Sequence, residues 1–207
     1  MRKIIILEGK QDAAFVKALA PDVETREIEI QELGGAGKDA IKALKIALTR
    51  VKNDALLKPV DKIGILLDLD PADFNEASKL AFVNAAVIDV FGIQLEEVGH
   101  FCEIPDIEAR LACHFISPNL DVLLKQIAAK SSLRADCLHA CLESQTHIKQ
   151  KEKEKAWPLY YMRWDICDVK ERENGAKHVN FSHTYSKGAW NLEAPILEDL
   201  KAFLALF

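Results

Sequence analysis

Two continuous apolar runs, each followed by an acidic residue, constrain the fold of this chain more than any other feature. Ile4–Leu7 contains only apolar residues and is followed by Glu8. Residues Ile63–Leu67 read IGILL and are followed by Asp68. A run without polar residues on either face is typical of a strand that is covered on both sides, as in a parallel sheet flanked by helices.

Segments with the spacing of helices lie between and after these runs. The apolar residues predict helices in residues 12–20, 41–51, 74–91 and 120–127, and further strands in residues 27–33, 101–104 and 112–116. Strand and helix therefore alternate through residues 1–130. This pattern predicts an α/β fold with a mostly parallel central sheet flanked by helices, and we expect residues 1–130 to form one domain.

Residues 131–207 have a different composition, because all three Trp and all three Tyr of the chain fall between positions 157 and 190. Helices are predicted in residues 133–142, 157–166 and 196–204, with a loop-rich stretch at 171–191. The charged segment 149–155 lies between the first two helices and is interpreted as a solvated helix end. Trp157, Tyr160, Tyr161 and Trp164 match one helical face. We expect an α-rich C-terminal extension, packed on the first domain, with these aromatic residues in its core.

Composition excludes some classes of protein. The formal net charge of −5 argues against a broadly basic surface for nucleic acid, although a local basic patch or a metal ion can serve the same purpose. No stretch approaches the ~18 apolar residues of a membrane span, and the apolar run after Met1 is too short for a signal peptide. The five cysteines are irregularly spaced. These features predict a reduced, cytoplasmic protein without membrane contact.

Four carboxylates are expected to meet at one edge of the sheet. Glu8 and Asp68 follow strands, Asp12 lies in the first turn of the next helix, and Asp70 comes two residues after Asp68. Ligand sites of parallel α/β sheets lie beyond the carboxyl ends of the strands. Carboxylates gathered there repel one another, and a hard divalent cation such as Mg²⁺ relieves that repulsion.

Each acid also has a simpler interpretation. Asp70 before Pro71 fits the N-cap and first position of a helix. Asp12 gains about 0.3–1 kcal/mol from the helix dipole without any metal. Glu8 is accounted for by solvation at a strand end. Asp68 is the hardest to explain in this way, because it directly follows the buried run and capping does not require it.

The stretch LEGKQD, followed some sixty residues later by LLDLD, resembles the Toprim domain of topoisomerases, primases, small nucleases and OLD-type nucleases. The form Glu-Gly-x-x-Asp is most similar to OLD-type nucleases and to small stand-alone bacterial Toprim-like proteins. The resemblance covers residues 3–130 and implies a Toprim or Rossmann-like fold. It implies acid–base work or metal binding for Glu8, and Mg²⁺ or Mn²⁺ binding by Asp68 and Asp70 with support from Asp12.

The resemblance implies further contacts. Gly9, Lys10 and Lys38 are expected to offer backbone or phosphate contacts, and Asp121 stands where the relatives carry another acid. The implied function is a metal-dependent phosphodiester hydrolase acting on nucleic acid, with Glu8 and Asp68 as catalytic residues. The alternative is a catalytically silent or partner-dependent binding module, for example beside an ATPase. A topoisomerase or a primase is not expected, since residues 131–207 are too few for the additional domains.

Other phosphate-handling classes fit less well. The stretch GGAGKD lacks the upstream glycine of a phosphate-binding loop, and Asp39 replaces the Ser or Thr after Lys38. Haloacid dehalogenase-type phosphatases carry Asp-x-Asp after their first strand, whereas here it follows a later one. Receiver domains carry an acidic pair after the first strand, whereas here Glu8 is followed by Gly9. Receiver-like phosphate chemistry at Asp68 stays open as a third alternative.

Two clusters in the extension have competing interpretations. Cys137, His139 and Cys141 offer metal ligands, but buried free cysteines are favoured because no matching Cys pair occurs elsewhere. A second group of basic residues lies among the aromatic residues and either receives a nucleic-acid strand or belongs to a helical cap, which the spacing favours. This group comprises Arg163, His178, His183 and Lys187.

Overall fold

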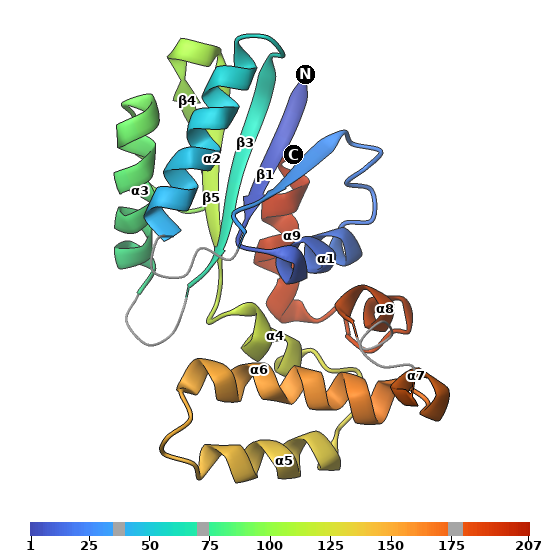
Figure 1. The fold of residues 1–207 in the computed structure, drawn as a ribbon. Helices are drawn as coiled ribbons and strands as arrows, with labels where there is room; N and C mark the ends of the chain where they lie inside the picture. Colours follow the sequence, from blue (N-terminus) through green and yellow to red (C-terminus); the bar gives the residue numbers. More distant parts are fainter. Residues whose placement is uncertain (35–39, 70–74, 174–179) are drawn as a thin grey trace. The chain divides into compact units, whose positions relative to one another are not determined.

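A computed structural model describes residues 1–34, 40–69, 75–173 and 180–207, and the chain divides into two compact units (Figure 1). The first unit contains Met1–Pro118 and Glu198–Phe207, and the second contains Asn119–Leu197. This division differs from the predicted boundary at residue 130. The end of the chain returns to the first unit because α9 (Glu198–Ala205) packs against β5.

In the described part of the chain, five strands form one sheet, in the order β2-β1-β3-β5-β4. The strands are β1 (Arg2–Leu7), β2 (Ile28–Glu32), β3 (Val60–Asp68), β4 (Cys102–Ile104) and β5 (Ala109–Ile116). Only the β4–β5 pair among them is antiparallel. The predicted α/β fold with a mostly parallel sheet is confirmed, and both apolar runs lie in strands.

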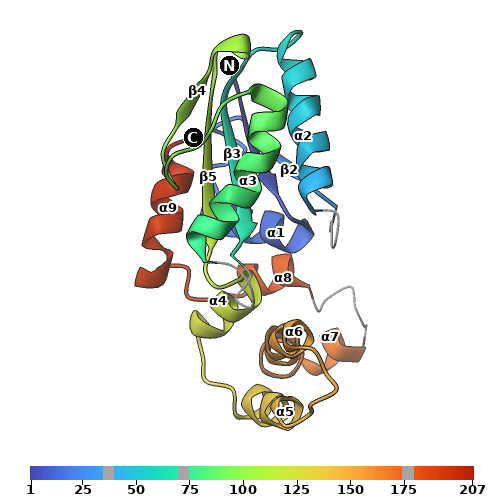
Figure 2. The same cartoon turned by 90° about the vertical axis from the view of Figure 1, so that its left-hand side faces the viewer.

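Helices cover both faces of the sheet. They are α1 (Lys10–Leu19), α2 (Ala40–Ala55), α3 (Glu76–Phe91) and α9. Figures 1 and 2 show α2 and α3 side by side on one face, with α1 and α9 on the other. Alternate strand residues supply the core under α2 and α3, where they meet apolar helix residues. This core includes Ile4, Ile6, Ile63, Ile65 and Leu67 from the strands, and Leu44, Leu48, Val51, Val83 and Val87 from the helices.

The face under α9 depends on a glycine. A Cβ atom added to Gly64 of β3 would lie 2.7 Å from Cζ of Phe207. The Phe207 ring is buried and packs against Phe101 and Phe203, with ring centroids 5.5 and 5.4 Å away. Lys62 of β3 donates a hydrogen bond to the carbonyl of Leu206. Gly64 therefore lets the end of the chain approach the sheet closely.

The second unit is helical, as predicted for the extension. Its longer elements are α4 (Leu120–Gln126), α5 (Leu133–Glu143), α6 (Gln150–Tyr161) and the π-helical turn η3 (Met162–Ile166), followed by α7 (Val169–Glu173) and α8 (Phe181–Ser186). Most of the charged segment 149–155 forms the first half of α6 and is exposed, in agreement with a solvated helix end. The stretch 171–191 was expected to be loop-rich but contains α8 and part of α7, so that expectation was wrong for these residues. Short 3-10 turns lie at Pro105–Ile107 in the first unit and at Pro195–Leu197 in the second.

The aromatic residues form the core of this unit. Trp157 and Tyr161 are buried and stack with ring centroids 5.1 Å apart, and Tyr161 lies 5.2 Å from Trp190. The hydroxyl of Tyr161 donates to the carbonyl of Ala189 at 3.0 Å. The aromatic core is therefore confirmed for Trp157 and Tyr161. Trp164 was also expected inside, but its side chain, which belongs to η3, is 39% exposed.

None of the helices in the described ranges combines the length and the apolar character needed to cross a membrane.

Candidate functional site

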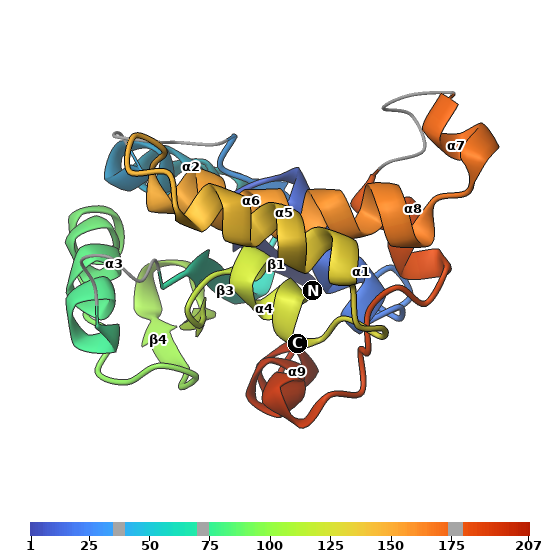
Figure 3. The same cartoon turned by 90° about the horizontal axis from the view of Figure 1, so that it is seen from below.

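The order of the strands creates a switch point between β1 and β3. The chain passes from β1 through α1 to β2 on one side of β1, and then through α2 to β3 on the other side. Helices α1 and α2 accordingly lie on opposite faces of the sheet (Figure 3). In open α/β sheets, ligands bind beyond the carboxyl ends of the strands at such a point.

Glu8 and Asp68 both lie at this switch point. Strands β1 and β3 are parallel neighbours in which Leu7 pairs with Leu66. Glu8 directly follows Leu7, and Asp68 is the last residue of β3. Both acids are half-buried. The structure therefore brings the two acids expected to be catalytic to adjacent strand ends at the same edge of the sheet.

Asp12 stabilises the start of α1. It is 8% exposed, and its Oδ2 accepts a hydrogen bond from the backbone N–H of Gly9, the N-cap residue, at 2.9 Å. A carboxylate at the third helical position that binds the N-cap amide is one half of a capping box. The predicted position of Asp12 in the first turn of the helix is therefore confirmed, and its contribution to a metal site stays a prediction. Lys10 is the first, exposed residue of α1, so its phosphate contact also stays a prediction.

Two predicted site residues, Asp70 and Lys38, lie outside the described residues. The helix that follows β3 begins at Glu76, and its N-cap is Asn75, whose side chain accepts a hydrogen bond from the N–H of Ser78 at 2.9 Å. The capping role considered for Asp70 in this helix therefore belongs to Asn75.

The two acids at the switch point are ligands of the type that binds a hard cation. Glu8 and Asp68 offer carboxylate oxygens, which Mg²⁺ and Mn²⁺ prefer over nitrogen or sulfur. Within residues 1–34, 40–69, 75–173 and 180–207, no group of three or more His, Cys, Asp or Glu side chains is placed to hold a metal ion. Asp70, the further donor expected from the sequence, is not among those residues.

Asp121 belongs to the second unit, whereas Glu8 and Asp68 belong to the first. It lies in the first turn of α4, whose N-cap Asn119 accepts a hydrogen bond from the N–H of Val122 at 3.0 Å. Burial raises the pKa of Asp121, and nearby Lys155 opposes that rise. Its interpretation as a first-turn acid is confirmed, and its membership of the acidic site stays a prediction.

Comparison with known families adds one finding. A family model described as "Protein of unknown function (DUF3226)" matches residues 2–207. The chain belongs to the DUF3226 family. The DUF3226 match spans both units, so the helical unit is as much a part of the family as the sheet. No curated protein and no solved structure matches the chain.

A further expectation, that the cysteines of α5 are buried, was wrong. In this DUF3226 chain, Cys137 and Cys141 are free and exposed, whereas burial was predicted. His139 between them lies 3.4 Å from the carboxylate of Glu143. Among the described residues, no group of three or more His, Cys, Asp or Glu side chains is placed to hold a metal ion here either. Helical spacing predicted this helix correctly, but it did not predict which of its faces is covered.

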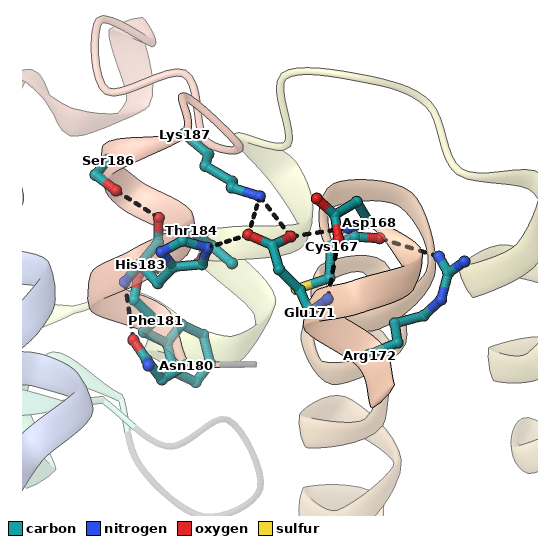
Figure 4. Close-up of polar contacts among 10 residues, drawn as sticks. All are labelled: Cys167, Asp168, Glu171, Arg172, Asn180, Phe181, His183, Thr184, Ser186 and Lys187. Carbon is teal, nitrogen blue, oxygen red and sulfur yellow. Dashed lines mark hydrogen bonds and ion pairs between the residues drawn. The ribbon is translucent and has the colours of Figure 1, made fainter. Parts of the chain in front are cut away.

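A polar cluster around Glu171 was not anticipated from the sequence (Figure 4). Glu171 and Asp168 form a reciprocal capping box at the start of α7, with backbone–carboxylate hydrogen bonds of 2.8 and 2.9 Å. The same Glu171 carboxylate lies 2.8 Å from Nε2 of His183 and 2.5 Å from Nζ of Lys187. The pattern Asp-x-x-Glu is the signal in the sequence that predicts this helix start.

The cluster ties α7 to α8 and its neighbouring turn. Hydrogen bonds from Lys187, from the N–H of Asp168 and from His183 lower the pKa of Glu171 to about 2. Glu171 therefore carries a negative charge that neutralises Lys187 and faces His183. This arrangement favours the helical-cap interpretation of these two basic residues over a surface that receives nucleic acid. His178, which was grouped with them, lies outside the described residues.

Proposed function

We propose that the edge of the sheet formed by the ends of β1 and β3 binds Mg²⁺ or Mn²⁺ and hydrolyses phosphodiester bonds of nucleic acid. One observation carries the proposal. Glu8 and Asp68 follow adjacent parallel strands at the point where the strand order reverses. This is the position at which open α/β sheets bind their ligands. The Toprim-like order of motifs in the sequence is consistent with the same use.

Each residue has a definite task in this proposal. Asp68 and Glu8 hold the cation together with Asp70, and Glu8 also orients the attacking water. A bound divalent cation supplies polarisation of the phosphate and neutralisation of charge in the transition state. Asp12 keeps the turn after β1 in place through its bond to the Gly9 amide. Lys10 contacts a substrate phosphate.

Gly9 offers room for a ligand. Its backbone is extended, and a Cβ atom placed there would meet its nearest neighbour, Oδ2 of Asp12, at 3.8 Å, an ordinary contact. The packing around Gly9 therefore does not require a glycine at this position. A residue without a side chain instead lets a phosphate group approach the backbone.

The charge of the chain favours a second candidate function. With a net charge of −5, attraction of a naked polyanion is weak, and affinity for free nucleic acid is expected to be low. A binding or regulatory module that keeps the metal site and works beside a partner, such as an ATPase, agrees with this charge. The two candidates share the acidic edge and differ in whether the isolated chain cleaves a substrate.

The test combines cleavage with metal binding. Supercoiled plasmid, single-stranded DNA and RNA are incubated with the wild type, Glu8→Gln and Asp68→Asn in Mg²⁺ or Mn²⁺. We expect cleavage by the wild type and a loss of roughly 10²-fold or more in both variants. Titration calorimetry with Mn²⁺ measures binding separately, and circular dichroism shows whether each variant is folded.

Glu32→Gln is a matched control. Glu32 ends β2 and pairs with Leu7, so it lies at the same edge of the sheet but away from the switch point, and it is exposed. We expect it to cleave like the wild type. Equal cleavage by Asp68→Asn and the wild type would contradict the proposal. Mn²⁺ binding that depends on Asp68, without any cleavage, would replace the nuclease by the partner-dependent module.

A further inference from the structure

Helix α5 leaves most of its apolar surface uncovered. Ala135 is its only buried residue, although leucines, alanines and cysteines make up most of the helix. Leu133 is 86% exposed and Leu138 is 39% exposed. Helices in proteins are stabilised mostly by packing of an apolar face, and α5 buries little apolar surface in this way. Exposed apolar side chains that lie together mark interaction sites.

The exposed side chains of α5 line a pocket. The pocket has a volume of about 400 Å³ and is formed by Leu133, Arg134, Cys137 and Leu138 of α5 together with Trp164 of η3. Its lining is apolar apart from Arg134. It lies wholly within the second unit, in which α5 packs against α6 and η3. Figure 1 shows α5 beside α6. We call these five residues the Trp164 pocket.

Arginines surround the Trp164 pocket. Arg134 donates to the carbonyl of Trp164 at 3.1 Å, and the guanidinium carbons of Arg163 and Arg172 lie 5.6 and 5.5 Å from the centroid of the Trp164 ring. Among the described residues, none of these three arginines forms an ion pair with a carboxylate. Three guanidinium groups without an ion pair to a described carboxylate therefore lie around the Trp164 ring.

Nearby carboxylates already have other partners. Asp165 accepts a hydrogen bond from Ser132, and Asp136 accepts one from Nε1 of Trp157 at 2.8 Å. Glu171 is held by Lys187, as described above. These acids are therefore engaged in holding the unit together. Ser132 and Trp157 are neutral donors, so Asp165 and Asp136 keep their charge, but neither acid makes an ion pair with the three arginines. The guanidinium groups therefore have donors left for a carboxylate from outside.

We propose that the Trp164 pocket docks an acidic amphipathic segment of a partner protein. An apolar side chain of the segment fills the pocket, and flanking carboxylates face Arg134, Arg163 and Arg172. This is the arrangement of a helix-in-groove contact, with apolar anchors and a charged rim. The proposal goes beyond the metal site and does not depend on it, because no residue of the β1–β3 edge takes part.

A protein segment suits this pocket better than a strand of nucleic acid. Bases bind to single-strand sites by stacking on exposed aromatic faces. Here guanidinium groups of Arg163 and Arg172 already lie over the Trp164 ring. The remaining lining is mostly aliphatic side chains and a thiol, which match an aliphatic anchor rather than a base.

The experiment uses a defined probe peptide and the full chain. The probe is an acetylated and amidated peptide with leucines at helical spacing and glutamates between them. The control peptide has lysine in place of every glutamate. Trp164 reports binding through its emission and its quenching by iodide, because Trp157 and Trp190 are only 3% exposed whereas Trp164 is 39% exposed. We expect the acidic peptide to shift and protect this emission, and the basic peptide to leave it unchanged.

Variants locate the binding site. Leu133→Asp and Arg163→Glu are expected to weaken binding of the acidic peptide roughly tenfold or more. Leu133 begins α5, where an acid is compatible with the helix, so folding is preserved. Leu57→Asp is the matched control, because Leu57 is also 86% exposed but lies after α2 in the first unit. Arg50→Glu, an exposed arginine of α2, is the control for charge.

Each alternative outcome overturns the proposal. Absence of binding up to roughly 1 mM peptide, the weak end of specific association, would remove the docking site. Equal binding of the acidic and basic peptides would show that the arginines do not select the partner. Binding of a single-stranded oligonucleotide that Arg163→Glu abolishes would assign the pocket to nucleic acid. Self-association that Leu133→Asp abolishes would assign it to a second copy of the chain.

Discussion

The strands of the sheet and helix α5 show opposite relations between apolar sequence and burial. Ile4, Ile5, Ile6 and Leu7 of β1 are each 0% exposed. Helix α5 is also rich in apolar residues, yet only Ala135 is buried. The strands have their apolar partners within the same unit, in α1, α2, α3 and α9. Apolar patterning therefore predicts a helix or a strand, whereas burial depends on whether the chain also supplies the opposing surface.

The largest expected effect tests this comparison directly. Ile65→Ala removes a core side chain that is 0% exposed, and we expect it to lower the free energy of unfolding by about 2–5 kcal/mol. Leu133→Ala removes a side chain that is 86% exposed and should change it by no more than ~0.5 kcal/mol. Denaturant unfolding followed by circular dichroism measures both values.

All three tryptophans lie in the second unit, so their fluorescence follows that unit separately. If Leu133→Ala lowered the free energy of unfolding as much as Ile65→Ala, the contrast between the strands and α5 would be contradicted. It would mean that α5 packs against a further surface in solution.

A second prediction concerns the close approach of Gly64 and Phe207 in the sheet unit. Gly64→Ala places a methyl group within 2.7 Å of the Phe207 ring, and we expect a loss of about 1–3 kcal/mol from overpacking. In the double variant Gly64→Ala with Phe207→Ala, the clash is absent, so the two single effects should not add. Additive effects in the Gly64–Phe207 cycle would contradict the packing described here.

The elements of the sheet could be predicted from sequence because their signal is local. The runs Ile4–Leu7 and Ile63–Leu67 are apolar on both faces, and this alone identifies buried strands. The pairing of β1 with β3 could not be predicted in this way. The spacing of Glu8 and Asp68 along the chain does not fix the strand order, and only that order brings the two acids to neighbouring strand ends.

The second unit was harder to predict for physical reasons. Lys and Glu in residues 149–155 are good helix formers, so a charged segment became the start of α6. Lys153 within it is 8% exposed and donates to the carbonyl of Glu143 at 3.0 Å, because a long side chain can bury its stem and keep its charged end bonded. The exposure of Cys137 and Trp164 depends on which surface opposes them, which helical spacing does not specify.

We expect the smallest change in stability at the polar tie between α8 and α7, a helix without any buried residue. The pKa of Glu171 is lowered from 4.5 to about 2 in the folded chain, chiefly by the hydrogen bond from Lys187. A carboxyl group whose pKa is lower in the folded than in the unfolded state stabilises folding fully above pH 4.5. That contribution declines as the pH falls from 4.5 towards 2, because the unfolded state then gains the proton first.

Glu171→Gln removes the charge and should therefore lower the melting temperature slightly above pH 4.5. The difference from the wild type should shrink as the pH is lowered towards 2. Melting curves by tryptophan fluorescence between these pH values measure the difference, and Glu173→Gln, an exposed acid in the same short helix, controls for the loss of one charge. A difference that stays constant through this range would show that neutral contacts of Glu171 hold α7 to α8.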